Sequence, residues 1–278
     1  MLRTRVLTGL VMIAVVIAAL AFLDTRGWAL AVLVLFVGAF WEWGRFAKLT
    51  GNALRAYVFI SVALALGLFL MGVGEQSVLA FTWLYGIATV FWALAVPVLL
   101  AQKIAVPTGW VLGVIGWIVL LPAWAAIAQG RLFGPLALFL LMGLTWIADI
   151  AAYFAGRAFG KKKLAPSISP GKTWAGVVGA VCGVLLLAVI CTYVAPLRPN
   201  FYATLVDKHT WLIAFPVVVA LVAVSVMGDL LESLLKRRVG MKDSSQLLPG
   251  HGGVLDRIDA LIATMPVALF IGSVLALW

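Results

Sequence analysis

The stretch WLIAFPVVVALVAVSVMGDLL, residues 211–231, contains no charged side chain before Asp229. An α-helix needs about 20 mainly apolar residues to cross the hydrocarbon core of a bilayer, and this run is long enough. Of the 278 residues in the chain, 65% are hydrophobic and 11% are charged, and the mean hydropathy is +1.16. Soluble domains have about half apolar and a quarter charged residues. The sequence therefore predicts an all-α polytopic membrane protein.

Further apolar runs of similar length lie on both sides of this one. We predict nine transmembrane helices, over residues 5–23, 28–47, 57–73, 78–100, 110–128, 135–156, 173–194, 211–231 and 259–277. Because Lys and Arg concentrate in cytoplasmic loops, their distribution sets the orientation. With a cytoplasmic N-terminus, only Arg26, Arg131, Arg198 and Lys208 of the 20 basic residues lie outside. The N-terminus is therefore expected in the cytoplasm and the C-terminus outside.

The net charge of +10 would also suit a nucleic-acid partner, but the basic residues follow the cytoplasmic loops instead. This distribution indicates the lipid bilayer as the partner and excludes nucleic acid. A bacterial inner membrane, with the functional site facing the cytoplasm, is the expected location.

The two parts of the chain differ in their polar residues. Residues 1–130 are almost free of charge within the spans and predict a scaffold of transmembrane helices. Glu42 is the one acid inside a span there; either it pairs with Arg45 three residues later or it has a function. Residues 131–278 place polar clusters at the cytoplasmic ends of their spans. We expect this second part to be the catalytic region.

The first polar cluster lies between residues 145 and 173. Asp149 falls within a predicted span, where an ionisable group is costly unless it is paired or hydrated. It either pairs with Arg157 or has a function. Ser169, Lys172 and Thr173 precede a predicted helix, whose free N–H groups and dipole favour an oxyanion. Helix capping alone would also explain the serine and the threonine.

The second polar cluster lies between residues 228 and 260. Asp229, Ser233 and Lys236 are spaced four and three residues apart, so they share one helix face. An ordinary helical ion pair between Glu232 and Lys236 is the alternative explanation of part of this pattern. Asp256, Arg257 and Asp259 then open the last predicted span. Carboxylates surrounded by Lys and Arg suit Mg²⁺ and a substrate that carries phosphates.

Other kinds of site fit the residues less well. The two histidines are isolated and no thiolate pattern is present, so zinc is not indicated. The residue types permit Ser-His-Asp hydrolysis, but the excess of basic residues favours a polyanionic substrate. A transporter, which belongs to a different functional class, would need polar residues along a path across the bilayer, whereas here they gather on one side. An enzyme that acts at the membrane surface is therefore the preferred interpretation.

The segment SLLKRRVGMKDSSQLLPGHGGVLDRID, residues 233–259, contains Ser-x-x-Lys-Arg, Lys-Asp and His-Gly-Gly-x-x-Asp-Arg-x-Asp in this order. It resembles the signature of the phosphatidate cytidylyltransferases, or CDP-diacylglycerol synthases. Residues 149–174 resemble the preceding conserved stretch of that family, so the likeness in motifs covers about residues 145–260. Ala175 departs from the acidic or amide side chain of many relatives, which argues against a polar role at that position.

The resemblance implies an Mg²⁺-dependent nucleotidyltransferase of phospholipid biosynthesis, which converts CTP and phosphatidic acid into CDP-diacylglycerol and pyrophosphate. It implies catalytic roles for Asp229 and Asp256 as metal-binding carboxylates, with Asp259 as a further metal ligand. Ser233 and Lys236 would be catalytic groups that contact phosphates. The implied substrate-binding residues are Asp149, Ser169, Lys172, Thr173, Arg237, Lys242, His251, Gly252, Gly253 and Arg257.

Some alternatives remain open at this point. The related CTP-dependent polyprenol and phytol kinases also combine CTP with a membrane lipid, although the His-Gly-Gly motif favours the synthase. A second cation such as K⁺ beside Mg²⁺ and a homodimeric assembly are both compatible with the sequence.

Overall fold

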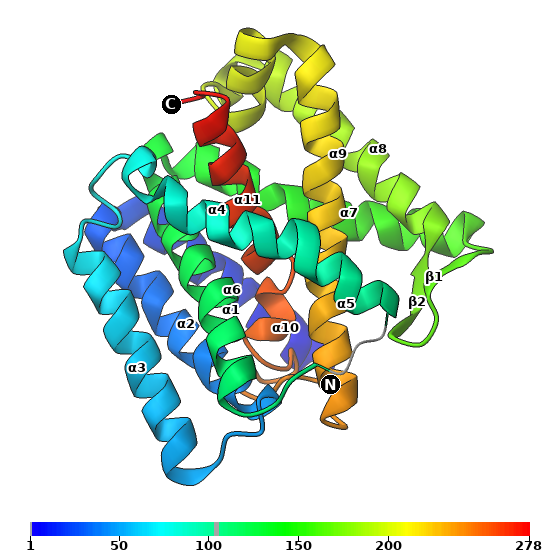
Figure 1. Cartoon of the computed structure of the whole chain (residues 1–278). Helices are drawn as coiled ribbons and strands as arrows, with labels where there is room; N and C mark the ends of the chain where they lie inside the picture. Colours follow the sequence, from blue (N-terminus) through cyan, green and yellow to red (C-terminus); the bar gives the residue numbers. More distant parts are fainter. Residues whose placement is uncertain (1, 103–105) are drawn as a thin grey trace.

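Helices form most of the computed structural model, which describes the backbone of residues 2–102 and 106–278 and the side chains of residues 8–101 and 106–278 (Figure 1). The α-helices are α1 (Leu2–Phe22), α2 (Thr25–Phe46), α3 (Gly51–Leu70), α4 (Thr82–Val90), α5 (Val96–Gln102), α6 (Trp110–Gly130), α7 (Pro135–Phe159), α8 (Trp174–Tyr193), α9 (Phe201–Arg238), α10 (Leu255–Ile258) and α11 (Leu261–Val274). The shorter helical turns are η1 (Val78–Phe81), η2 (Phe91–Ala95), η3 (Arg131–Phe133) and η4 (Ala195–Leu197).

The apolar runs of the sequence form the long helices. Within the described residues, seven segments are long and apolar enough to cross a membrane: Thr25–Phe46, Gly51–Leu70, Val78–Ala101, Trp110–Phe133, Pro135–Phe159, Trp174–Tyr193 and Phe201–Arg238. Two shorter apolar helices, Thr8–Phe22 and Leu261–Val274, coincide with the first and last predicted spans. The all-α polytopic membrane fold is therefore confirmed. The count of nine spans and the orientation of the termini stay predictions.

The 38 residues of α9 are more than one crossing needs, and the helix is broken at Thr210. This residue has φ 59° and ψ 174°, which is not a helical conformation. The predicted span begins at residue 211, directly after the break. Before it, Lys208 Nζ and His209 Nε2 contact the backbone oxygens of Ala276 and Leu275 at 2.5 Å and 2.8 Å. The first part of α9 thus holds the C-terminal end of the chain.

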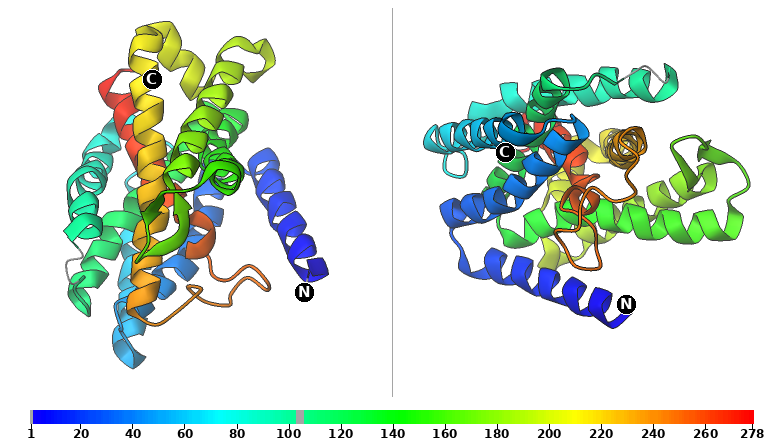
Figure 2. Two further views of the ribbon diagram at one scale, coloured as in Figure 1. Left: turned by 90° about the vertical axis from the view of Figure 1, so that its right-hand side faces the viewer. Right: turned by 90° about the horizontal axis from the view of Figure 1, so that it is seen from below.

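A small antiparallel hairpin lies where the sequence predicted only a loop between helices. Strand β1 (Lys163–Ala165) pairs with β2 (Ser169–Thr173), with Lys163 opposite Thr173 and Ala165 opposite Ser169. Thr173 also begins α8, because its Oγ1 accepts a hydrogen bond of 3.1 Å from the N–H of Gly176. The capping role of Thr173 is therefore confirmed. The hairpin connects α7 to α8, and β2 packs against α8 and α9 (Figure 2).

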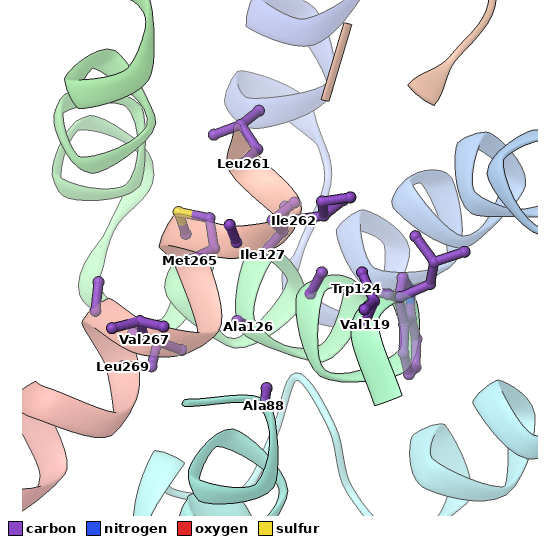
Figure 3. Close-up of a cluster of buried hydrophobic side chains, with 14 of the residues drawn as sticks. Ala88, Val119, Trp124, Ala126, Ile127, Leu261, Ile262, Met265, Val267 and Leu269 are labelled. Atoms are coloured by element: carbon purple, nitrogen blue, oxygen red, sulfur yellow. The ribbon is translucent and has the colours of Figure 1, made fainter. Parts of the chain in front are cut away.

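Helix α11 lies in the centre of the bundle. Its residues from Leu261 to Leu269 are all buried, and it packs against α4, α6 and α9. Figure 3 shows Ile262 and Met265 of α11 beside Trp124 and Ile127 of α6. Because α10 directly precedes this central helix, the packing of α11 in the core fixes the position of the polar residues of α10.

Candidate active site

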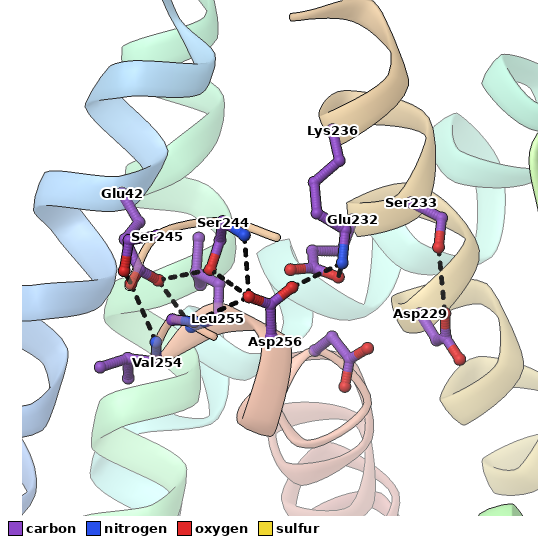
Figure 4. Close-up of polar contacts among 12 residues, drawn as sticks. Glu42, Asp229, Glu232, Ser233, Lys236, Ser244, Ser245, Val254, Leu255 and Asp256 are labelled. Atoms are coloured by element: carbon purple, nitrogen blue, oxygen red, sulfur yellow. Dashed lines mark hydrogen bonds and ion pairs between the residues drawn. The ribbon is translucent and has the colours of Figure 1, made fainter. Parts of the chain in front are cut away.

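Lys172 and Asp229 form the first part of the site. The Nζ of Lys172, on β2, lies 2.5 Å from Oδ2 of Asp229, on α9. Ser233, one turn further along α9, donates a hydrogen bond of 3.2 Å from its Oγ to Oδ1 of the same aspartate (Figure 4). Asp229 and Ser233 therefore lie on one face of α9, as predicted, and Lys172 of the hairpin supplies the positive charge beside them.

A cavity of about 590 Å³ adjoins this ion pair. Asp149 of α7 lines it together with Lys172 and Asp229. Arg157 also lines the cavity, but its Nη1 donates to Tyr153 Oη at 3.1 Å rather than to Asp149. The alternative that Asp149 pairs with Arg157 is therefore wrong. The further lining residues are Ala148, Ala152, Gly156, Leu164, Gly171, Thr173, Gly176, Val177, Ala180 and Val226.

Lys236 organises the second part of the site. Its Nζ lies 2.6 Å from Oε2 of Glu232 and 2.6 Å from Oδ1 of Asp256. The side chains of Glu232 and Asp256 are only 2% and 5% exposed, so the lysine lies between two carboxyl groups that are almost withdrawn from water. The helical ion pair expected as an alternative does form, and the same ammonium group also joins α9 to α10.

Asp256 is held from several directions. Its Oδ2 accepts hydrogen bonds of 2.8 Å from the N–H of Ser244, the hydroxyl of Ser244 and the N–H of Gly253. Burial alone would raise the pKa of Asp256, but the hydrogen bonds from Lys236, Gly253 and Ser244 outweigh it and lower the pKa to about 2. Asp256 therefore carries its negative charge at neutral pH.

Asp259 approaches Asp229 because α9 and the start of α11 touch. A Cβ atom added to Gly228 would lie 2.4 Å from the backbone oxygen of Asp259, so only glycine permits this contact. The charges of Asp149, Asp229 and Asp259 interact with one another and with that of Lys172. Three carboxylates, on α7, on α9 and in the turn between α10 and α11, therefore share one electrostatic environment.

Glu42 belongs to the same polar network, although sequence reasoning left its role open. Its carboxylate accepts hydrogen bonds from both hydroxyls of Ser244 and Ser245 and from the backbone N–H groups of Val254 and Leu255 (Figure 4). Arg45, the suggested partner, instead donates to the backbone oxygen of Ser244 at 3.2 Å. The pairing of Glu42 with Arg45 is therefore wrong. The feature of the sequence that pointed to Glu42 was an acidic residue inside an apolar span.

Other predicted site residues lie further from these contacts. His251 lies against α1, where a Cβ atom added to Gly9 would be 3.5 Å from its Nε2. Ser169 lies at the start of β2, opposite Ala165. The basic side chains of Arg237, Lys242 and Arg257 are exposed. Gly252 is the exception, because a Cβ atom added to it would lie 2.7 Å from Oδ2 of Asp256. The substrate-binding roles of these residues stay predictions.

The acidic residues fit a metal ion only in part. Within the described residues, no group of three or more His, Cys, Asp or Glu side chains is arranged to hold a metal ion. The predicted ligands Asp229, Asp256 and Asp259 are thus not preassembled as a three-ligand cluster. Mg²⁺, however, is usually held by one or two carboxylates together with water and substrate phosphates. A carboxylate has about four lone-pair sites, so Asp229 retains free positions beside Lys172 and Ser233.

Comparison with known proteins gives the site its context. A model of the cytidylyltransferase family matches residues 3–275. The phosphatidate cytidylyltransferase of Haemophilus influenzae is 38% identical over 287 residues, which cover 96% of this chain and 96% of that protein. The phosphatidate cytidylyltransferase of Pseudomonas aeruginosa is 38% identical over 275 residues, covering 96% of this chain and 95% of that protein. The chain therefore belongs to the cytidylyltransferase family.

Proposed function

We propose that this protein is a phosphatidate cytidylyltransferase that transfers CMP from CTP to phosphatidic acid and releases pyrophosphate. The observation that carries the proposal is the presence of two lysine–carboxylate contacts. Lys172 pairs with Asp229 at the edge of a cavity of about 590 Å³, and Lys236 pairs with the almost buried Asp256. Full-length similarity to two proteins of this name supports the choice of substrates.

The reaction needs little acid–base chemistry from the protein. An oxygen of the lipid phosphate attacks the α-phosphorus of CTP, and the bond from this phosphorus to the bridging oxygen of the β-phosphate breaks. Pyrophosphate leaves with the bonding electrons. Since the attacking oxygen is already anionic, catalysis depends on holding two polyanions in line and neutralising their charge.

The two lysines are suited to this task. Lys172 and Lys236 are each held by carboxylates, so both ammonium groups are in place before a phosphate arrives. When a triphosphate enters, its oxygens compete with these carboxylates for the ammonium groups. Ser233 and Arg237 lie on the same helix and would add hydrogen bonds to phosphate oxygens. Asp149 lines the same cavity, and we assign it to substrate binding.

Mg²⁺ is the cofactor that we propose for this site. Asp229 and Asp256, supported by Asp259, would hold the ion, which would neutralise charge on the triphosphate. A second cation such as K⁺ is a further part of this proposal. The predicted substrate contacts of Ser169, Thr173, Lys242, His251, Gly252, Gly253 and Arg257 belong to the same proposal.

The membrane supplies the setting of the reaction. We propose an integral protein of a bacterial inner membrane, with a cytoplasmic N-terminus and the site facing the cytoplasm, where CTP is available. Residues 1–130 would form the scaffold and residues 131–278 the catalytic region. A homodimer remains part of the proposal, to be tested by the mass of the purified protein in detergent.

Labelled CTP tests the proposed reaction. Purified protein is incubated with phosphatidic acid and Mg²⁺, and with CTP labelled at either the α- or the γ-phosphate. Cytidylyl transfer places the α-label, and no γ-label, in the lipid fraction. A CTP-dependent lipid kinase would give the opposite result with a polyprenol or phytol acceptor. Absence of both labels from lipid would contradict an enzyme of either kind and favour a transporter.

A further inference from the structure

We infer that Glu42, in the N-terminal half of the chain, is a positioning residue that sets Asp256 in the active site. This inference rests on the proposed function, because it concerns the carboxylate that we assign to the reaction. Glu42 itself does not contact the cavity beside Asp229. It acts on the segment of residues 244–255, which contains the last part of the connection from α9 and the first residue of α10.

The contacts of Glu42 clamp both ends of the 244–255 segment. At one end, the hydroxyls of Ser244 and Ser245 donate to Oε2 and Oε1 at 3.0 Å and 2.5 Å. At the other end, the N–H groups of Val254 and Leu255 donate to Oε1 and Oε2 at 2.9 Å and 2.7 Å. One carboxylate therefore closes the segment into a loop just before α10 begins.

Ser244 connects this clamp directly to Asp256. Its single hydroxyl hydrogen is shared between two carboxylate oxygens, Oε2 of Glu42 at 3.0 Å and Oδ2 of Asp256 at 2.8 Å from the Oγ. Its backbone N–H donates to the same Oδ2 at 2.8 Å. Ser245, by contrast, donates to Glu42 and accepts from the N–H of Leu247 at 3.1 Å, and it has no contact with Asp256. The two neighbouring serines thus differ in one respect that an experiment can use.

The fit of α2 against the 244–255 segment leaves little freedom. Gly38, Glu42 and Arg45 are spaced four and three residues apart on one face of α2, and all three adjoin the segment. A Cβ atom added to Gly253 would lie 2.2 Å from Oε1 of Glu42 and 2.0 Å from Oγ of Ser244. Gly253 N–H meanwhile donates to Asp256. A shift of the Glu42 carboxylate must therefore be passed on to Asp256.

The cost of burial also argues that Glu42 has a specific task. Its side chain is fully buried, in a helix that the sequence places in the membrane. A buried carboxylate is stable only when donors compensate it, and four donors from the 244–255 segment do so. An apolar residue would fill α2 at lower cost, but it would leave α10, which has only four residues, without a fixed starting point.

The primary test compares wild-type protein with Glu42→Gln in nanodiscs. The amide has nearly the same shape, but its NH₂ group faces N–H and O–H donors instead of accepting from them. We expect kcat to fall and the Mg²⁺ concentration for half-maximal activity to rise. The two effects should combine to about 10- to 100-fold, with little change in KM for phosphatidic acid. Hydrogen exchange at Val254 and Leu255 should quicken by about 10-fold or more, which needs no activity to be observed.

Ser244→Ala and Ser245→Ala form the matched pair. Both variants remove one hydrogen bond to Glu42, but only Ser244→Ala also removes a contact to Asp256. We expect Ser244→Ala to reproduce the shift in Mg²⁺ requirement and Ser245→Ala to change it by less than about threefold. A role that is merely structural would lower the melting temperature of both variants and leave the Mg²⁺ requirement of the folded enzyme unchanged.

The outcomes distinguish a failure of the proposed function from a failure of the role of Glu42. If wild-type protein transfers no label from CTP to lipid, the proposed function fails. If wild-type protein is active and Glu42→Gln keeps its kcat and Mg²⁺ requirement, the positioning role of Glu42 is overturned. Should Glu42→Gln not fold, the serine pair decides: equal behaviour of Ser244→Ala and Ser245→Ala overturns the role as well.

Discussion

Lys172 on β2 and Asp229 on α9 form an ion pair of 2.5 Å that joins the hairpin to the longest helix of the protein. Both side chains are about a quarter exposed, at 23% and 27%, so substrate and water can still reach them. The pair therefore keeps a positive charge at the edge of the cavity without sealing it.

The first prediction concerns the charge of Lys172. Replacement by Met keeps the length of the side chain but removes the ammonium group that would meet the triphosphate. We expect kcat/KM for CTP to fall by about 100-fold, the loss typical of one charged stabilising group. Lys161→Ala, which removes an exposed charge outside the cavity lining, should retain most activity. Equal losses in the two variants, in steady-state assays with labelled CTP, would contradict a specific role.

The second prediction concerns the carboxylate of Asp229. Asp229→Asn preserves shape but removes the charge that we assign to the metal, so activity should fall by about 100-fold or more while the fold is kept. Asp207→Asn is the control, because Asp207 lies on the same helix and pairs with Arg198 away from the cavity. Circular dichroism should show folded protein in both cases, and the activity assay should show the loss in Asp229→Asn alone. Full activity of Asp229→Asn would show that the carboxylate is misassigned.

Metal removal gives the third prediction. Chelation with EDTA should abolish transfer, and added Mg²⁺ should restore it, since Lys172 and Lys236 are each already paired with a carboxylate and do not by themselves balance the charge of the triphosphate. Asp259→Asn should raise the Mg²⁺ concentration needed for half-maximal activity by about 10-fold. A titration of activity against free Mg²⁺ measures both effects. Transfer that persists in EDTA would remove the metal from the proposal.

The close approach at Gly228 supports a fourth prediction. Gly228→Ala forces a methyl group to within 2.4 Å of the backbone oxygen of Asp259 and should destabilise the protein by about 1–3 kcal/mol. Thermal unfolding followed by circular dichroism in detergent measures the change. Gly67→Ala is matched to it, because an added Cβ there meets nothing within 4 Å and improves helix propensity. A similar melting temperature for both variants would contradict tight contact between α9 and Asp259.

Substrate binding should order part of the 244–255 segment. Its two ends are held by Glu42 and Asp256, whereas Gln246, Leu247 and Pro249 are exposed between them. We expect hydrogen exchange at residues 246–251 to slow when CTP and Mg²⁺ are added, because closure over a nucleotide would protect the backbone. Exchange in α3 serves as the internal reference. Slow exchange at residues 246–251 without ligand, unchanged by CTP and Mg²⁺, would exclude a closing movement.

The spans were predictable because crossing a bilayer demands a length of apolar sequence, and that demand can be read from consecutive residues. The break at Thr210 agrees with this demand. The polar residues Asp207, Lys208 and His209 directly precede it, and the apolar run begins directly after it. The hairpin was missed because residues 163–173 are short, basic and rich in proline and glycine, without the alternation that indicates strands.

The site was predictable where its members are close in sequence and not where they are distant. Asp229, Ser233 and Lys236 share one helix face by spacing alone, and the structure places them so. The partners of Glu42 lie more than 200 residues away, so no local pattern could identify them. The position of His251 against α1 likewise depends on packing between segments that are distant in the sequence.

The clamp formed by Glu42 also has a consequence for how the chain is made. Glu42 is synthesised 202 residues before Ser244, the first of its partners along the chain. At about 5–20 residues per second, this delay lasts roughly 10–40 s. During that time the carboxylate lacks all four donors, and an unpaired charge is costly within a membrane. The N-terminal helices, which carry none of the catalytic motifs, therefore complete their own burial only when the end of the chain arrives.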